Sequence, residues 1–178
     1  DYGPCAFMNA YHPATVYSSI DEQGRYAFGN QPNIIKWNLA RFAEALLPII
    51  APEKEAAIAL AQDALDAFDA RWQRQYQGMM LQKLGFGSQQ TTHWPLVEQL
   101  LDLMEQHELD YTNTFASLTD STEVAPTDIA ALKSWRAEWQ NALAATTQPE
   151  QAKERMLANN PAYIPRNHLV EQALQAAN

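Results

Sequence analysis

Cysteine and basic residues are scarce in this sequence, and each shortage argues against a class of protein. Cys5 is the only cysteine, so an internal disulfide framework like that of small secreted domains is excluded. The 12 lysines and arginines are outnumbered by 21 aspartates and glutamates, which leaves a net charge of -9. Because nucleic-acid affinity comes mostly from clusters of Lys and Arg that neutralise phosphates, this composition disfavours a nucleic-acid partner.

Long apolar runs and targeting patterns are also missing. The apolar stretch from Ala45 to Ala51 is short and contains Pro48, whereas a membrane-spanning helix needs about 20 apolar residues. No segment has the basic and then apolar pattern of a signal peptide. We therefore expect no membrane partner and predict a cytoplasmic location in a bacterium, with a mitochondrial location as the alternative.

The first 32 residues differ in composition from the rest of the chain. They contain three of the six glycines and three of the ten prolines, and their aromatic residues follow no helical period. This pattern predicts a loop-rich arm over residues 1–32, held down by its aromatic side chains. Residues 33–178 are predicted to form a helical domain, because 47% of the chain is hydrophobic and suffices for a core.

Apolar residues recur at intervals of three and four in residues 33–178, as on one face of a helix. The first helix is predicted to begin near Pro32, to end near Pro48 and Pro52, and to bury the stripe Ile35, Leu39, Phe42, Leu46 and Ile49. A long second helix is predicted over residues 53–84, with a buried stripe that includes Leu60, Phe68, Trp72 and Tyr76.

Five shorter helices are predicted further along the chain, over residues 95–106, 110–118, 127–144, 147–158 and 167–177. Asp110 is expected to cap the first turn of one, and Thr147 with Glu150 to form a capping box at another. Gly78, Gly85 and Gly87 are candidate helix ends. No alternating strand pattern is present, so the predicted fold class is all-α with a loop-rich N-terminal arm.

Several residues could carry chemistry by type but not by pattern. The histidines lack the spacing of zinc ligands, and Gly85 to Gly87 lacks the third glycine and the preceding strand of a dinucleotide loop. The carboxylates of Asp63, Asp66 and Asp69 are interpreted as a solvated helix face. Cys5 is interpreted as a packed thiol. The five tryptophans fall mostly on apolar helix faces and are interpreted as core residues, and Trp37 is one of them.

Asp1, Tyr2 and Gly3 form an Asp-x-Gly element at the start of the chain. By itself such a tripeptide indicates only a turn. It resembles, however, the Asp-Phe-Gly element of protein kinases, in which the carboxylate binds the Mg²⁺ that bridges nucleotide phosphates. A hard oxygen ligand on a tight turn suits that ion.

Further motifs follow in order and support a specific resemblance. The chain resembles the selenoprotein O (SelO/YdiU) family in the segments Asp1 to Pro4, Asp21 to Tyr26, Asn30 to Pro32, Trp37 to Arg41, Tyr111 to Phe115 and Asn160 to Asn167. These segments are dispersed over most of the chain. Several separate matches in register are much more informative than the Asp-x-Gly element alone.

The resemblance implies the C-terminal helical part of a protein kinase-like fold. Members of the family transfer AMP from ATP to hydroxyl side chains of proteins, with ATP and Mg²⁺, or Mn²⁺ in its place, as cofactors. By position, Asp1 matches the family's metal- and ATP-binding aspartate. The general base, the second metal ligand and the nucleotide-binding lobe precede this motif in the family, so no general base is expected in this chain.

The expected partners are therefore protein substrates with hydroxyl side chains and an upstream nucleotide-binding lobe of the same protein. The 178-residue chain is predicted to be inactive alone, since one carboxylate is a poor Mg²⁺ site. Two rival functions remain, a non-catalytic helical scaffold of the pseudokinase kind and a phosphotransferase. Within the activation-segment-like arm, Arg25 is a candidate for binding a phosphate or an acidic group, or else for tying loop carbonyls or Asp21.

Overall fold

The computed structural model describes residues 6–120 and 128–177, and every regular element in these ranges is helical. The helices are α1 (Gln31–Ile50), α2 (Lys54–Asp66), α3 (Phe68–Lys83), α4 (Trp94–Gln106), α5 (Tyr111–Asp120), α6 (Ala130–Thr146), α7 (Pro149–Asn159) and α8 (Asn167–Ala176). Two 3-10 turns, Phe28–Asn30 and Thr91–His93, precede α1 and α4. The all-α class predicted from periodicity is confirmed for the described residues.

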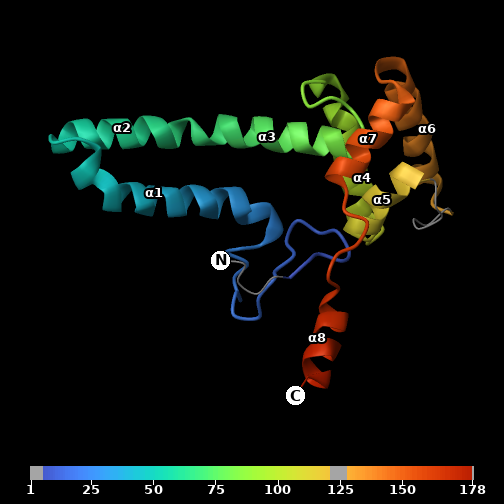
Figure 1. Cartoon of the computed structure of the whole chain (residues 1–178), viewed down its shortest axis with the longest axis horizontal. Helices are drawn as coiled ribbons and strands as arrows, with labels where there is room; N and C mark the ends of the chain where they lie inside the picture. The colour runs from blue at the N-terminus through green and yellow to red at the C-terminus, as the bar shows by residue number, and fades with distance from the viewer. Residues whose placement is uncertain (1–5, 121–127, 178) are drawn as a thin grey trace.

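The helices are arranged as a long hairpin attached to a compact cluster. Figure 1 shows α1 running outward and α2 and α3 running back along it. Both arms of this hairpin point away from α4, α5, α6 and α7. The C-terminal end of α3 enters the cluster, whereas α8 stands apart from it. The hairpin therefore reaches the cluster mainly through one helix end. Among the described residues, no helix combines the length and the apolar character that crossing a membrane requires.

The predicted second helix is divided in two. It ends at Asp66 and resumes at Phe68, with Ala67 (φ -73°, ψ -11°) as the joint. Only part of its predicted stripe is buried, since Leu60 is exposed and Phe68, Trp72 and Tyr76 are half-buried. These three rings stack along one side of α3 at centroid distances of 6.2 Å and 6.4 Å. The aromatic ladder stiffens the helix on the way to the core.

The face of α1 that the sequence predicts as buried is the wrong one. Ile35, Leu39, Phe42 and Ile49 are between 37% and 80% exposed. The sequence prediction was wrong because α1 carries a second set of apolar residues, such as Ile34, Ala43 and Leu47, that packs instead. Helical periodicity alone does not say which set meets α2. On that inner side Lys36 pairs with Asp69 of α3 at 2.6 Å.

Proline positions in α1 agree with the prediction at one end and differ at the other. Pro32 lies in the first turn, where the missing N–H costs no hydrogen bond. Pro48, expected to end the helix, lies inside it, and α1 continues to Ile50. Only two residues of α1 follow Pro48, so a single hydrogen bond is lost near an end that would fray in any case.

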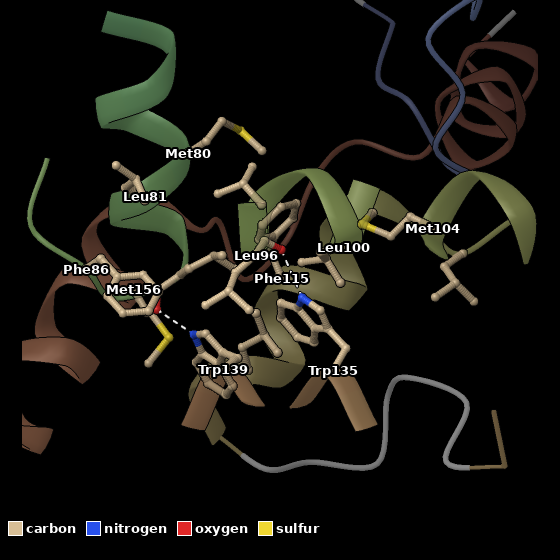
Figure 2. Packing of buried hydrophobic residues seen from close by; sticks show 14 of the residues in the cluster. Met80, Leu81, Phe86, Leu96, Leu100, Met104, Phe115, Trp135, Trp139 and Met156 are labelled. Carbon is tan, nitrogen blue, oxygen red and sulfur yellow. Dashed lines mark hydrogen bonds between the residues drawn. The ribbon is translucent and has the colours of Figure 1, made fainter. Parts of the chain in front are cut away.

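The hydrophobic core gathers around the end of α3, with side chains from α4, α5, α6 and α7 (Figure 2). Two indole N–H groups are satisfied inside it, Trp135 by the Leu96 carbonyl and Trp139 by the Leu84 carbonyl, both at 2.9 Å. An unpaired buried carbonyl or indole would cost about 1–3 kcal/mol, so these bonds fix where α6 lies against α3 and α4. The prediction that Trp135 and Trp139 are core residues is confirmed.

Three predicted helix ends have different outcomes. Gly85 (φ +86°) ends α3 in a Schellman motif, in which its N–H bonds the Gln82 carbonyl at 3.0 Å and the Phe86 N–H bonds the Leu81 carbonyl at 3.0 Å. Gly78 is not a helix end but a buried position within α3. The capping box at Thr147 was also wrong. Its hydroxyl is buried without a hydrogen-bond partner among the described residues, and Pro149 begins α7.

Candidate functional site

The proposed metal ligand Asp1 and the thiol of Cys5 lie outside the described residues, which begin at Ala6. What the structure describes is how the segment immediately after them is held. Phe7, Met8, Asn9 and Tyr11 run along the junction of α4 and α5. The candidate site is therefore built from the arm and its attachment, not from the carboxylate itself.

Backbone hydrogen bonds attach the arm to the α4–α5 junction. Ala10 and Asp110 form an isolated antiparallel bridge. The Tyr11 N–H donates to the Leu109 carbonyl at 2.8 Å, and the Tyr111 N–H donates to the Asn9 carbonyl at 2.7 Å. This pair of bonds fixes the register of the arm against the helices, as in a short piece of sheet.

Arg166, in the motif at residues 160–167, connects the motif at residues 111–115 with the arm. Its guanidinium binds both carboxylate oxygens of Asp110, at 2.5 Å and 3.1 Å, and also the side-chain oxygens of Asn9 at 2.7 Å and Asn113 at 3.1 Å. Arg166 and Asp110 are both partly buried. A planar guanidinium with several donors suits this arrangement, which a lysine ammonium could not reproduce.

Asp110 has two roles in the same network. Besides accepting from Arg166, its carboxylate accepts the Asn113 N–H at 2.8 Å, which confirms the predicted cap of α5. The next residue of the C-terminal motif, Asn167, exchanges long hydrogen bonds of 3.5 Å with the backbone of Phe7. The motifs at residues 111–115 and 160–167 thus meet around the arm that follows Asp1.

An aromatic cluster fills the space beneath the arm. The Tyr11 ring stacks on Tyr111 at 5.8 Å, and Phe28 meets both rings at 6.1 Å. Phe115 lies 5.0 Å from Tyr111. Burial, aided by neighbouring acidic and phenolic groups, raises the pKa of Tyr11 to about 12, and burial likewise raises the pKa of Tyr111. The prediction that aromatic residues hold down the arm is confirmed for these side chains.

Lys83 is a buried cation that the sequence analysis did not single out. Only 7% of the residue is exposed, and its ammonium donates to the Asn159 carbonyl at 3.2 Å while lying over the Phe115 ring at 4.6 Å. Burial lowers the pKa of Lys83 to about 8. The backbone carbonyl of Lys83 also accepts a hydrogen bond, from the Asn160 side chain at 2.9 Å. The spacing of Tyr76, Met80 and Lys83 on one helix face was the signal that could have identified it.

A cavity of about 240 Å³ lies between Lys83 and the arm. Its walls are mostly apolar and come from the arm, α5 and the loop before α8, including Phe7, Tyr17, Phe115 and Ile164. A larger hollow of about 660 Å³ lies on the arm itself, lined by residues such as Ser18, Glu22 and Arg25. Both hollows are lined in part by the segment between Ala6 and α1.

Arg25 does not pair with Asp21 through its side chain, while its candidate role in binding a phosphate or an acidic group stays a prediction. The Asp21 carboxylate accepts the backbone N–H groups of Arg25 and Tyr26, both at 2.8 Å, so Asp21 shapes the loop without pairing with the guanidinium. The guanidinium lies over the Trp37 ring at 4.5 Å. Trp37 is exposed and not part of the core, which corrects the prediction for that residue.

Other predictions for this region are tested directly by side-chain contacts. The Asn30 side chain donates to the Arg25 carbonyl at 2.7 Å and so holds the turn before α1. Asp63, Asp66 and Asp69 are exposed, as predicted, and Asp69 pairs with Lys36. Within residues 6–120 and 128–177, no three His, Cys, Asp or Glu side chains gather as a metal site. His12 instead lies 3.4 Å from Glu105.

Taken together, the described residues form an all-helical unit that fastens a loop-rich arm through an arginine-centred polar network. The family model of protein adenylyltransferase SelO matches residues 1–178, and the chain belongs to that family.

Curated relatives are similar over nearly the whole chain. Protein nucleotidyltransferase YdiU of Geobacillus kaustophilus (strain HTA426) is 52% identical over 180 residues, that of Bacillus thuringiensis (strain Al Hakam) 48%, and that of Shouchella clausii (strain KSM-K16) 47%. Each alignment covers 99% of this chain and 37% of the relative. The chain therefore spans little more than a third of the length of these relatives.

Proposed function

We propose that this chain works as the C-terminal helical part of a longer, kinase-like polypeptide that transfers AMP from ATP to hydroxyl side chains of proteins. Asp1 supplies a carboxylate to a Mg²⁺ ion on the nucleotide phosphates. The general base and the nucleotide-binding lobe come from outside these 178 residues. The chain by itself is inactive.

Membership of the adenylyltransferase family is the observation that carries this proposal. The described geometry supports it in one further respect. The backbone bridge at Ala10, the Arg166 network and the aromatic cluster all hold the segment that starts within ten residues of Asp1. A metal ligand must be held within a fraction of an ångström to act, and such attachment of the adjoining backbone serves that purpose.

Within the described ranges, no ready-made group of metal-ligating side chains is present. Mg²⁺ prefers oxygen ligands in octahedral geometry and is usually shared between one or two carboxylates and substrate phosphates. No suitable cluster of carboxylates occurs in the described ranges, and Asp1 lies outside them. In this proposal the chain therefore contributes Asp1 and the arm that positions it, while the general base and the nucleotide-binding lobe come from elsewhere.

The direct test uses the longer polypeptide with ATP labelled on the α-phosphate or on the γ-phosphate. AMP transfer places the α-label on protein, with Mg²⁺ required and chelation abolishing incorporation. Transfer of the γ-label alone would mean a phosphotransferase, and no transfer of either label would favour a non-catalytic scaffold.

A substitution at Asp1 tests the role of its carboxylate. Asp1→Ala and Asp1→Asn in the longer polypeptide should each lower the rate by at least about 100-fold, because a metal ligand at the phosphates is lost. Asp63→Ala, which removes an exposed carboxylate of α2, is the matched control and should leave the rate unchanged. Full activity of both Asp1 variants would remove this residue from the mechanism, as would AMP incorporation by the 178-residue chain alone.

A further inference from the structure

The outer face of α1 carries a row of large apolar side chains that the described chain covers only in part. Ile35, Leu39, Phe42 and Ile49 are 37%, 39%, 58% and 80% exposed. Together with the half-buried Leu46 they recur at intervals of four and three, so they form one continuous stripe along the helix. We call these five residues the α1 stripe.

The stripe is unusual because α1 is apolar on its inner side as well. The side toward α2 and α3 includes Ala40, Ala43 and Leu47, which are half-buried. Only three of the twenty residues of α1 are charged, namely Lys36, Arg41 and Glu44. A helix that is apolar on two faces is typical of the interior of a larger protein, where both faces meet other elements.

We propose that the α1 stripe is the surface on which the remaining part of the longer polypeptide packs, so that α1 is an internal helix of the complete fold. This inference rests on the proposal that the chain acts within a longer polypeptide, but it does not depend on AMP transfer. The relatives have 63% of their length outside the part that matches this chain, since the match covers 37%. That length supplies the second layer that α1 lacks.

Position and charge favour this occupant over others. The stripe begins five residues after Asn30, where the arm ends, so an element packed on it lies next to the arm that the proposed active site requires. Membrane binding through an amphipathic helix favours a polar face rich in Lys and Arg, whereas α1 has one of each and a glutamate. A contiguous apolar face of this kind marks a protein contact.

Two variants of α1 compare the effect of a charge on the stripe with the effect of a charge elsewhere on the helix. Phe42→Lys places a charge on the stripe, and Glu44→Lys places the same side chain about 200° around the helix. In the 178-residue chain Phe42→Lys should leave the melting temperature within about 2 °C of the parent, because the position is exposed. Glu44→Lys loses an exposed ion pair with Arg41 and should cost no more than about 1 kcal/mol. In the longer polypeptide Phe42→Lys should lower the melting temperature by at least about 5 °C, since an unpaired charge is then buried, while Glu44→Lys should not.

Thiol labelling gives a second measurement that does not require a destabilised variant. In a Cys5→Ser background, Leu39→Cys and Glu44→Cys should react with maleimide at similar rates in the 178-residue chain. In the longer polypeptide, peptide mass spectrometry should find the reaction at Leu39→Cys slowed at least 10-fold and that at Glu44→Cys unchanged. Equal rates at both positions in the longer polypeptide would overturn the proposal.

A second copy of the polypeptide is the competing occupant of the α1 stripe. If the longer polypeptide forms dimers that Phe42→Lys dissociates and Glu44→Lys does not, the stripe binds a second copy and the proposal is wrong. All these measurements are made without nucleotide, so they remain informative if the longer polypeptide proves to transfer no AMP.

Discussion

At the scale of single residues, Arg166 has the most connections in the described chain. It joins the C-terminal motif to Asp110 at the start of α5 and to Asn9 in the arm, across sequence separations of 56 and 157 residues. Two parallel bonds to one carboxylate and further bonds to two amide oxygens need the planar, multi-donor guanidinium. This residue therefore couples the position of the arm to the folding of the helices.

Removing that guanidinium should be costly. Arg166→Ala is expected to reduce the free energy of unfolding by about 1–3 kcal/mol, because Asp110, Asn9 and Asn113 lose charge-assisted partners at a partly buried place. Arg166→Lys should recover less than half of the loss, since an ammonium cannot form the same pair of parallel bonds. Urea unfolding of the three proteins measures both effects. A loss below about 0.5 kcal/mol for Arg166→Ala would show that the network contributes little.

Lys83 should make stability depend on pH in an unusual direction. Its pKa is about 8 in the folded protein and 10.5 ordinarily, so above pH 8 the folded state releases a proton that the unfolded state still binds. Stability contributed by this group therefore rises between about pH 8 and pH 10.5, by up to about 3 kcal/mol. The raised pKa values of Tyr11 and Tyr111 oppose this above about pH 10, where unfolded tyrosines ionise.

The rise should thus be visible between pH 8 and pH 10 in denaturant unfolding. Lys83→Met keeps the length and apolar stem of the side chain but has no titrating group, so its stability should be flat or falling over the same interval. A parent protein whose stability falls steadily from pH 8 to pH 10, in parallel with Lys83→Met, would contradict the assignment.

At the scale of elements, the end of α3 depends on one glycine. Gly85 has φ +86°, and a Cβ there would lie 3.3 Å from the Ala152 Cβ and 3.3 Å from the Ala152 carbonyl oxygen of α7. Only glycine adopts this backbone conformation without strain, and the backbone carbonyl oxygen cannot move aside easily. The Schellman motif and the close approach of α3 to α7 therefore share a single residue.

Gly85→Ala is expected to lower the free energy of unfolding by about 1–3 kcal/mol through strain at positive φ. Gly87→Ala is a suitable comparison, because a Cβ there would meet only the end of the flexible Gln90 side chain, at 3.2 Å. Its cost should stay below about 1 kcal/mol. Thermal unfolding followed by circular dichroism distinguishes the two, and equal costs would show that the positive φ of Gly85 is unimportant.

At the scale of the whole molecule, stability should be concentrated in the cluster and not in the hairpin or in α8. The largest fully buried side chains lie at the end of α3, just after it, and in α4 and α5. No residue of α8 is buried. Regions with few buried apolar contacts open at a small cost in free energy, whereas core helices open only with global unfolding.

Native-state hydrogen exchange measures this distribution. The amides of Met80 to Leu84 and of Leu100 to Met104 should exchange most slowly, with those of α1 beyond Phe42 faster and those of α8 fastest. In the longer polypeptide the α1 amides should exchange more slowly if the stripe is covered. Protection of α8 equal to that of α4 in the 178-residue chain would contradict this ordering.

Local signals in the sequence were sufficient for most of the helices, because apolar periodicity, Asp110 and Gly85 act within a few residues of themselves. They missed the break at Ala67 and the continuation of α1 past Pro48. They also identified the motifs that meet at the arm, although the metal-binding role of Asp1 and the division at residue 32 stay predictions. Tertiary structure alone decided which face of α1 packs and that Arg166 reaches Asn9. Such contacts join residues far apart in the chain, and an apolar face looks the same in a sequence whether its partner lies within these 178 residues or outside them.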